Sequence, residues 1–435
     1  MEIKAFKAYR YDDAVVGNSS NCIAPPYDVI DDNQQAVLHN KSEFNIAHVT
    51  KGKIFATDTD TNNVYTRAAV YFNNWLAKGA IKEDKREAIY AYVQDFSAAG
   101  MTLTRSGFIA LGKLVAFGKG VQPHEKTLDG PKADRLRLTR ATAAQFGQIF
   151  MLYDDPKKVA DAIIAQAAKG KAIAHLTDED GVEHRIYAIE DAAAQAAIIK
   201  MMADKSPVIA DGHHRYETAL NYYNETKNPK AEYCMITFVN MYNEGLVVLP
   251  THRLVDSVEG FDMGLLITAV GQMFDIKEYR FTDTGKDDAK RQMFAAMLED
   301  FKAGENSFGI YGNDGSFYKI RLKSLEHIRQ AAPELSDASQ RLDVWILHRL
   351  ILDGILGIGD KQLATESNLE YIKDIGDAID RSIAGVDSGE KQVVFFMNPT
   401  RVEQVKAVAD AGEKMPQKST FFYPKIFTGF TINKY

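Results

Sequence analysis

The feature that most constrains the fold is the stretch from residue 207 to 220, in which a short apolar run meets a glycine and then a cluster of polar side chains. Val208 and Ile209 are β-branched, which favours a strand, and Gly212 tolerates backbone angles that other residues avoid. Apolar residues between positions 216 and 223 then recur at helical spacing. The pattern predicts a strand, a tight turn and a helix that begins directly after the glycine.

The polar cluster after the glycine predicts an anion site. His213, His214 and Arg215 would occupy the first turn of the helix. A helix start carries unpaired N–H groups and a partial positive charge, so cationic side chains are unfavourable there unless an anion binds too. A lone histidine in this position would favour a solvated helix start with a satisfied side chain. The complete string from Asp211 to Arg215 favours a phosphate site instead.

Length and charge limit the classes of function. The chain has 435 residues, enough for two or three folded units, and its 46% hydrophobic and 26% charged residues are typical of globular proteins. The formal net charge of -7 opposes a surface that coats nucleic acid or anionic membranes, because such surfaces need clustered Lys and Arg. We therefore expect no nucleic-acid partner, and an anion site that is local.

Cysteine usage and the N-terminus indicate a compartment. Cys22 and Cys234 stand in unrelated contexts, which disfavours a disulfide scaffold and a zinc site. The residues from Met1 to Lys7 lack the apolar core of a signal peptide, and no uninterrupted apolar run approaches membrane-spanning length. We expect a cytoplasmic protein without a membrane partner.

Helical and strand patterns alternate along the chain, which predicts an α+β fold of mixed sheets and helices. No Pro/Gly-rich seam marks a boundary, and we expect three regions, namely 1–117, 118–255 and 256–435. Expected strands include 88–96, 103–117 and 233–241, and expected helices include 131–144, 191–203, 262–273 and 286–303. A helix near residues 64–76 would turn an aromatic face to the core.

A second cluster of charged residues, from 123 to 135, lies between a predicted strand and a predicted helix. Glu125 is a candidate general base for a substrate hydroxyl, provided that burial or a like charge raises its pKa from the ordinary value of about 4.3. Lys126, Lys132 and Arg135 are candidates for neutralising phosphates. Taken alone, the cluster is also typical of a solvated loop with local ion pairs.

Five strings spread over almost the entire chain resemble the bacterial and archaeal family catalogued as domain of unknown function 1015. They lie at residues 25–29, 123–135, 211–216, 249–253 and 415–420. The string at 211–215 also resembles the nucleotide-binding signature of the ParB and sulfiredoxin superfamily, which includes the free serine kinases. The resemblance implies a ParB/sulfiredoxin-like central region flanked by N- and C-terminal α+β regions. A long insertion separates the two central motifs, and the flanking regions are absent from compact relatives.

The resemblance also implies roles for individual residues. Glu125, Asp211 and His213 would be catalytic, with Asp211 also holding Mg²⁺ directly or through water. Nucleotide phosphates would be bound by Gly212, His213, His214, Arg215, Lys126 and Thr127. Further candidates are Asp28, Lys132, Arg135, Arg253 and Lys418. Asp28 is equally well explained as a helix cap or turn residue, and Arg253 and Lys418 as structural ion-pair partners.

The expected function is a nucleotide-dependent phosphotransferase that uses ADP or ATP with Mg²⁺ and acts on a small hydroxyl compound. L-Serine is the leading substrate, and the same site could run in reverse from O-phosphoserine. One alternative is a phosphoserine phosphatase in which water replaces the alcohol. Another is a ParB-like regulatory protein that binds nucleotide without turnover. The sequence leaves the oligomeric state and the identity of the base, Glu125 or Asp28, open.

Overall fold

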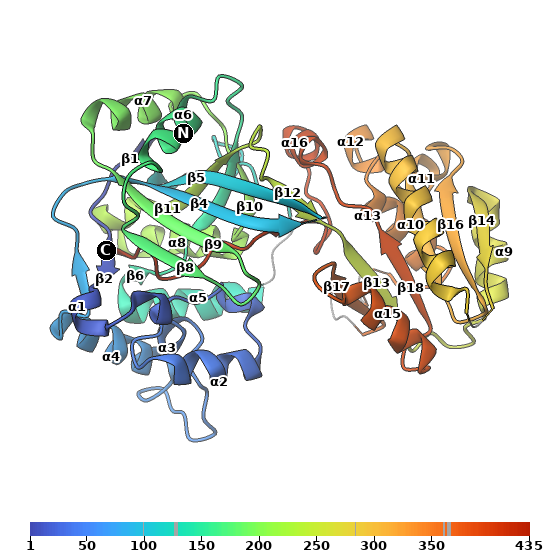
Figure 1. Ribbon diagram of the computed structural model, residues 1–435, viewed down its shortest axis with the longest axis horizontal. Coiled ribbons are helices and arrows are strands. Elements are labelled where there is room, and N and C mark those ends of the chain that lie inside the picture. The colour runs from blue at the N-terminus through green and yellow to red at the C-terminus, as the bar shows by residue number, and fades with distance from the viewer. Residues whose placement is uncertain (99, 126–128, 283, 360–361, 363–366) are drawn as a thin grey trace. The chain divides into compact units, whose positions relative to one another are not determined.

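The computed structural model describes the chain except residues 99, 126–128, 283, 360, 361 and 363–366, and it confirms an α+β fold (Figure 1). The chain forms two compact units. Unit 1 contains Met1–Pro123, Thr127–Val247 and Pro424–Tyr435, and unit 2 contains His124–Lys126 and Val248–Tyr423. Among the described residues, we find no helix with the length and apolar character needed to cross a membrane.

Unit 1 is built on one eight-stranded sheet in which a single strand pair, β7 with β11, is parallel among the described pairings. The aromatic and β-branched residues of β4 and β5 form its longest hairpin, with Tyr90 opposite Ile109. The order is β10 (Val208–Asp211), β7 (Ile149–Tyr153), β11 (Tyr233–Asn240), β5 (Met101–Lys113), β4 (Ile89–Ala98), β9 (Glu183–Ile189) and β8 (Ala174–Thr177), with β1 (Ile3–Lys4) beside β5.

Helices of unit 1 bury their apolar faces against this sheet or against one another. The main core joins sheet residues with α6, α7 and α8, as in the packing of Ile164, Ile198 and Tyr216. The expected aromatic face of α4 is confirmed for Phe72 and Trp75, but Tyr71 is 39% exposed because it lies at the edge beside His48. The bounds are α2 (Asp32–Lys41), α3 (Ala47–Thr50), α4 (Val64–Ala77), α5 (Asp129–Thr142), α6 (Val159–Ala167), α7 (Ala192–Met202) and α8 (His213–Thr226).

The expected boundary at residue 117 falls inside unit 1. Strands from both sides of this position pair in one sheet, with β5 next to β11. The last residues of the chain also return to unit 1, where β20 (Asn433–Lys434) pairs with β6 (Ala144–Gln145). Long-range strand pairing therefore determines the boundaries of the two units, and no shift in amino-acid composition marks these boundaries.

Unit 2 is built on a six-stranded antiparallel sheet. Asn313 and Gly315, with φ of +56° and +84°, form the turn between β15 and β16. Its order is β14 (Phe274–Arg280), β16 (Ser316–Leu322), β15 (Ser307–Tyr311), β18 (Val393–Met397), β13 (Thr251–Val255) and β17 (Leu369–Lys373). The helices include α9 (Met263–Met273), α10 (Lys286–Ala303), α15 (Ala378–Asp387) and α16 (Val402–Asp410), and β12 (Val247–Leu249) pairs with β19 (Phe421–Tyr423).

Candidate functional site

The turn between β10 and α8 has the strand, turn and helix that the sequence predicts. Gly212 has φ of +89° and forms the N-cap of α8 without a side-chain cap. A Cβ atom at this position would lie 2.8 Å from Nε of Arg215, so the arginine folds back over the glycine. Only glycine allows both this backbone angle and this close approach.

Asp211 ends β10 beside two cations from different parts of unit 1. Its Oδ2 atom lies 3.2 Å from Nζ of Lys425 and 3.5 Å from Nη2 of Arg215. Burial opposes ionisation of the carboxyl group, but the charges of Lys425, Arg215 and His213 outweigh it and hold the pKa of Asp211 below its ordinary value. Asp211 is therefore a carboxylate at neutral pH.

Arg215 is oriented by the protein on two sides. It donates a hydrogen bond to the backbone carbonyl of Gln148 and pairs with Asp211 on the same side of the helix start. Its side chain is 12% exposed. A guanidinium has five N–H groups in a planar fork, so these contacts fix its direction and leave it the capacity to bind an anion.

His214 follows on the first turn of α8 in a mixed electrostatic environment. Burial lowers its pKa, the carboxylates of Glu217 and Asp28 oppose the shift, and the charges of Lys132 and Arg215 add to it. Lys132 Nζ lies 3.5 Å from the Glu217 carboxylate. With a pKa below the ordinary 6.5, His214 is mainly neutral at pH 7 and can serve as a hydrogen-bond partner.

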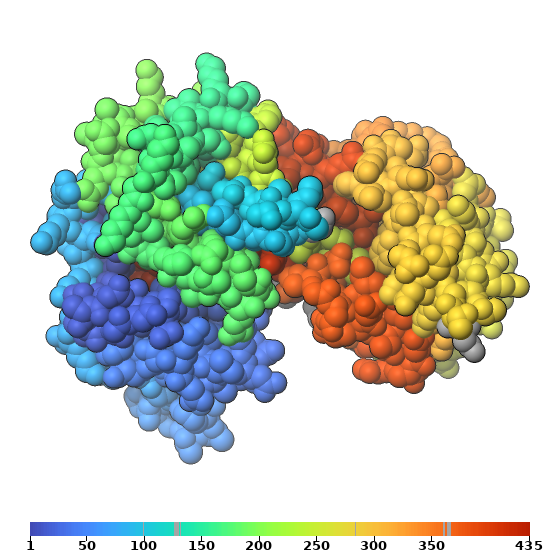
Figure 2. All heavy atoms as spheres, viewed as in Figure 1, coloured from blue at the N-terminus to red at the C-terminus, as the bar shows by residue number. Residues whose placement is uncertain are grey.

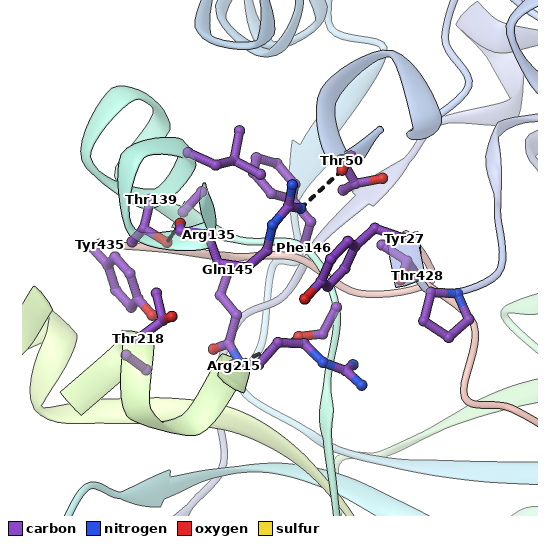
Figure 3. Close-up of a pocket in the computed structure, with 15 residues that line it drawn as sticks. Tyr27, Thr50, Arg135, Thr139, Gln145, Phe146, Arg215, Thr218, Thr428 and Tyr435 are labelled. Carbon is purple, nitrogen blue, oxygen red and sulfur yellow. Dashed lines mark hydrogen bonds between the residues drawn. The ribbon is translucent and has the colours of Figure 1, made fainter. Parts of the chain in front are cut away.

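A pocket opens beside this helix start (Figure 3). It comprises about 580 Å³ of space, open solvent included, and it is lined by Tyr27, Phe146, Tyr435, two arginines and four threonines. Arg135 stacks over the Tyr27 ring at 3.9 Å and donates to the Thr50 carbonyl at 2.8 Å. Figure 3 shows the Tyr27 ring between the side chains of Arg135 and Arg215.

The structure brings most of the predicted residues together in unit 1. Those residues are Asp28, Lys132, Arg135, Asp211, Gly212, His213, His214 and Arg215. Their proximity follows from the pairing of α5 with α8 and from the short 3-10 helix Tyr27–Val29, which carries the exposed Asp28. Lys126 and Thr127 lie outside the described residues.

Three predicted residues, Glu125, Arg253 and Lys418, form a separate cluster in unit 2. The Glu125 side chain accepts a hydrogen bond from the backbone N–H of Lys418 at 2.8 Å. Arg253 is 1% exposed and donates to the Lys418 carbonyl at 3.2 Å. Burial lowers the pKa of Arg253 to about 10, against the opposing effect of Tyr371 and Glu125. The pairing of Glu125 with the start of α8 stays a prediction.

The predicted magnesium role of Asp211 is not favoured by its surroundings. Lys425 and Arg215 already neutralise this carboxylate and would repel a divalent cation. Within the described part of the chain there is no group of three or more His, Cys, Asp or Glu residues arranged for a metal. A magnesium ion at Asp211 would have to compete with these two side chains, and the magnesium role of this residue stays a prediction.

Sequence reasoning missed Lys425 and Tyr27 as members of the site. Lys425 lies 214 positions from Asp211 and has no motif around it. Tyr27 lies within the string at residues 25–29, of which only Asp28 is predicted as a site residue. The stacking of Tyr27 under Arg135 could not be predicted because it depends on how α5 packs.

A family model described as protein of unknown function (DUF1015) matches residues 3–345, which confirms the predicted family and includes four of the five strings. Among solved structures, a free serine kinase in complex with AMP is 13% identical, with 70% of this chain and 83% of that chain covered and a TM-score of 0.32. A conserved hypothetical protein from Pyrococcus furiosus is 14% identical, with 71% and 89% covered and a TM-score of 0.31. SbnI from Staphylococcus aureus, C-terminally truncated, is 10% identical, with 73% and 84% covered and a TM-score of 0.31. No protein of curated function matches the chain.

Proposed function

The chain belongs to the DUF1015 family, and we propose that it is a nucleotide-dependent phosphotransferase that acts on a small hydroxyl compound, with free L-serine as the leading substrate. The observation that carries the proposal is the cationic start of α8 next to a pocket in unit 1. Arg215 connects the start of α8 with the pocket, because it contacts Asp211 and also lines the pocket.

The pocket supports a ligand with a planar organic part and a polyanionic end. Its rings, those of Tyr27, Phe146 and Tyr435, offer apolar and stacking surfaces, and its threonines offer hydrogen bonds to a nucleoside. Arg135 and Arg215 supply positive charge at the same place. In a chain of net charge -7, this local concentration of cations needs an explanation, and a phosphate ligand provides it.

In the proposed reaction, the substrate hydroxyl oxygen attacks the terminal phosphorus of ADP or ATP. A new oxygen–phosphorus bond forms, the bond from phosphorus to the bridging oxygen breaks, and AMP or ADP leaves with that oxygen. The hydroxyl proton passes to a carboxylate and then to solvent. Arg215 and the amides after Gly212 hold the phosphates in line and neutralise their charge.

We assign the base role to Glu125, with Asp28 as the alternative carboxylate. The Glu125 carboxylate has an oxygen that accepts a hydrogen bond from the Lys418 amide at 2.8 Å, which fixes the direction of this side chain. Asp28 is exposed, and its charge acts on His214 in unit 1. Magnesium would enter with the nucleotide and would supply positive charge that neutralises the phosphates.

Phosphorus NMR of the purified protein with Mg²⁺, L-serine and either ADP or ATP tests the proposal. We expect an O-phosphoserine signal that grows as the nucleotide loses its terminal phosphate. Inorganic phosphate alone would indicate hydrolysis, and unchanged nucleotide with measurable binding would indicate a regulatory module. If calorimetry shows that neither AMP, ADP nor ATP binds, the proposal is wrong.

A further inference from the structure

The segment Pro424–Tyr435 belongs to unit 1, although residues 248–423 before it belong to unit 2. Ile426, Phe430 and Ile432 are at most 3% exposed. In the view of Figure 2, little of the dark red that marks the end of the chain is visible on unit 1. The position of its backbone is therefore fixed by burial on several sides.

Buried polar side chains of β4 and β5 hold the start of this segment. Gln94 Nε2 donates to the Lys425 carbonyl at 3.0 Å, and Arg105 donates to the Pro424 carbonyl. Arg105 Nε also donates to Gln94 Oε1 at 3.0 Å, which links the two supports. Arg105 is 1% exposed, and burying a guanidinium is costly unless it is hydrogen-bonded. The structure thus uses a buried charge to place the backbone of Lys425.

This placement brings a second cation to the start of α8. The ammonium of Lys425 and the guanidinium of Arg215 face the same Asp211 oxygen at 3.2 and 3.5 Å. The Lys425, Arg215 and Asp211 side chains are 17%, 12% and 18% exposed. Both cations face one carboxylate, and the helix start adds its partial positive charge beside them. Because water screens this region weakly, this group of positive charges favours an anion nearby.

The residues also define an order along a ligand. Arg215 lines the pocket, whereas Lys425 is not part of its described lining and is linked to Arg215 through their shared partner Asp211. A nucleoside in the pocket would place its first phosphate at Arg215 and its next one toward Lys425. We propose that Lys425 binds the terminal phosphate of a nucleoside diphosphate and that Asp211 positions its ammonium. This inference rests on the proposed function.

A purely structural ion pair between Lys425 and Asp211 makes a different prediction. A phosphate-binding Lys425 distinguishes ADP from AMP, whereas a structural lysine affects the binding of both nucleotides equally or not at all. We therefore compare AMP and ADP binding by isothermal titration calorimetry in wild type, Lys425→Met, Lys425→Arg and the control Lys434→Met from the same segment. Lys425→Met should weaken ADP binding by about tenfold or more and AMP binding by less than about twofold. Lys425→Arg should recover part of the ADP affinity, and Lys434→Met should match wild type.

A folding control keeps the test decisive. Lys425→Met leaves Asp211 with one cation fewer and lowers stability, so thermal unfolding is measured for every variant. Should this variant fail to fold, the double variant Asp211→Asn with Lys425→Gln removes both charges together, and it should bind ADP no more tightly than AMP. If a folded Lys425→Met variant binds ADP as tightly as wild type and keeps the same preference for ADP over AMP, the role of Lys425 is wrong and the proposed function is unaffected. Absence of AMP and ADP binding in wild type overturns the proposed function and, with it, this inference.

Discussion

Replacement of Arg215 by alanine tests the phosphate site most directly. The substitution removes the guanidinium that lines the pocket, its hydrogen bond to the Gln148 carbonyl and its ion pair with Asp211. Lys425 stays next to the Asp211 carboxylate at 3.2 Å, so the buried charge keeps one partner. We expect the protein to fold, with a free energy of unfolding lower by about 1 to 3 kcal/mol because a buried acceptor loses its donor.

The effect of this substitution on nucleotide binding follows from the chemistry of the guanidinium. A charge-assisted hydrogen bond contributes about 1.5 to 3 kcal/mol, and the 12% exposure of the Arg215 side chain means that solvent screens it only weakly. The dissociation constant for ADP should rise by about tenfold to a hundredfold. Arg215→Lys should recover only part of the affinity, because an ammonium cannot make the two parallel hydrogen bonds of a guanidinium fork.

Isothermal titration calorimetry with ADP measures this effect, and Arg140→Ala is a matched control. Arg140 also belongs to unit 1, and its pair with Glu225 has side chains that are 52% and 40% exposed. Its removal should cost less than about 1 kcal/mol of stability and leave the ADP affinity unchanged. Unchanged ADP affinity in a folded Arg215→Ala variant would refute the phosphate site at the start of α8.

Three further outcomes are expected. Glu125→Gln should lower turnover by about 10²- to 10⁴-fold with ADP binding near normal, and a variant that keeps its rate in the phosphorus NMR assay would exclude the base role. Gly212→Ala should lower the free energy of unfolding, measured with urea, by about 1 to 3 kcal/mol, and it should also weaken ADP binding because the new Cβ would meet Arg215. The control Gly304→Ala, at φ of +82° and with no neighbour within 4 Å of its Cβ, should lower the free energy of unfolding and leave ADP binding unchanged. Burial lowers the pKa of His48 in the folded protein. As the pH drops, this histidine is therefore protonated in the unfolded chain at a higher pH than in the folded protein, and the free energy of unfolding should fall below about pH 6.5. The fall should be smaller in His48→Gln, and an equal or steeper fall would contradict this origin.

The start of α8 could be predicted because all its signals lie within one short stretch. β-branched residues, a glycine and a helical repeat follow one another there, and each acts on its own backbone. The strands β4 and β5 could be predicted for the same reason. Even the role of Gly212 follows from its local sequence, although the contact of Arg215 with it required the structure.

Contacts between distant segments could not be predicted in this way. Lys425 reaches Asp211 only because β20 pairs with β6 and because Arg105 and Gln94 bind the backbone before and at the lysine. None of these pairings has a pattern in the residues near Lys425. Glu125 shows the same limit, since it belongs to unit 2, where it forms a β-bridge with Met415, whereas Pro123 before it belongs to unit 1.

The difference between the expected and observed surroundings of Asp211 has a physical explanation. A carboxylate in a phosphate-binding motif suggests a metal ligand when the sequence alone is considered, because magnesium and phosphate occur together. In the structure, Asp211 instead balances Lys425 and Arg215. Two partly buried cations side by side would repel each other and destabilise the unliganded protein. The Asp211 carboxylate between them reduces this repulsion, so both cations can stay at the start of α8 when no phosphate is bound.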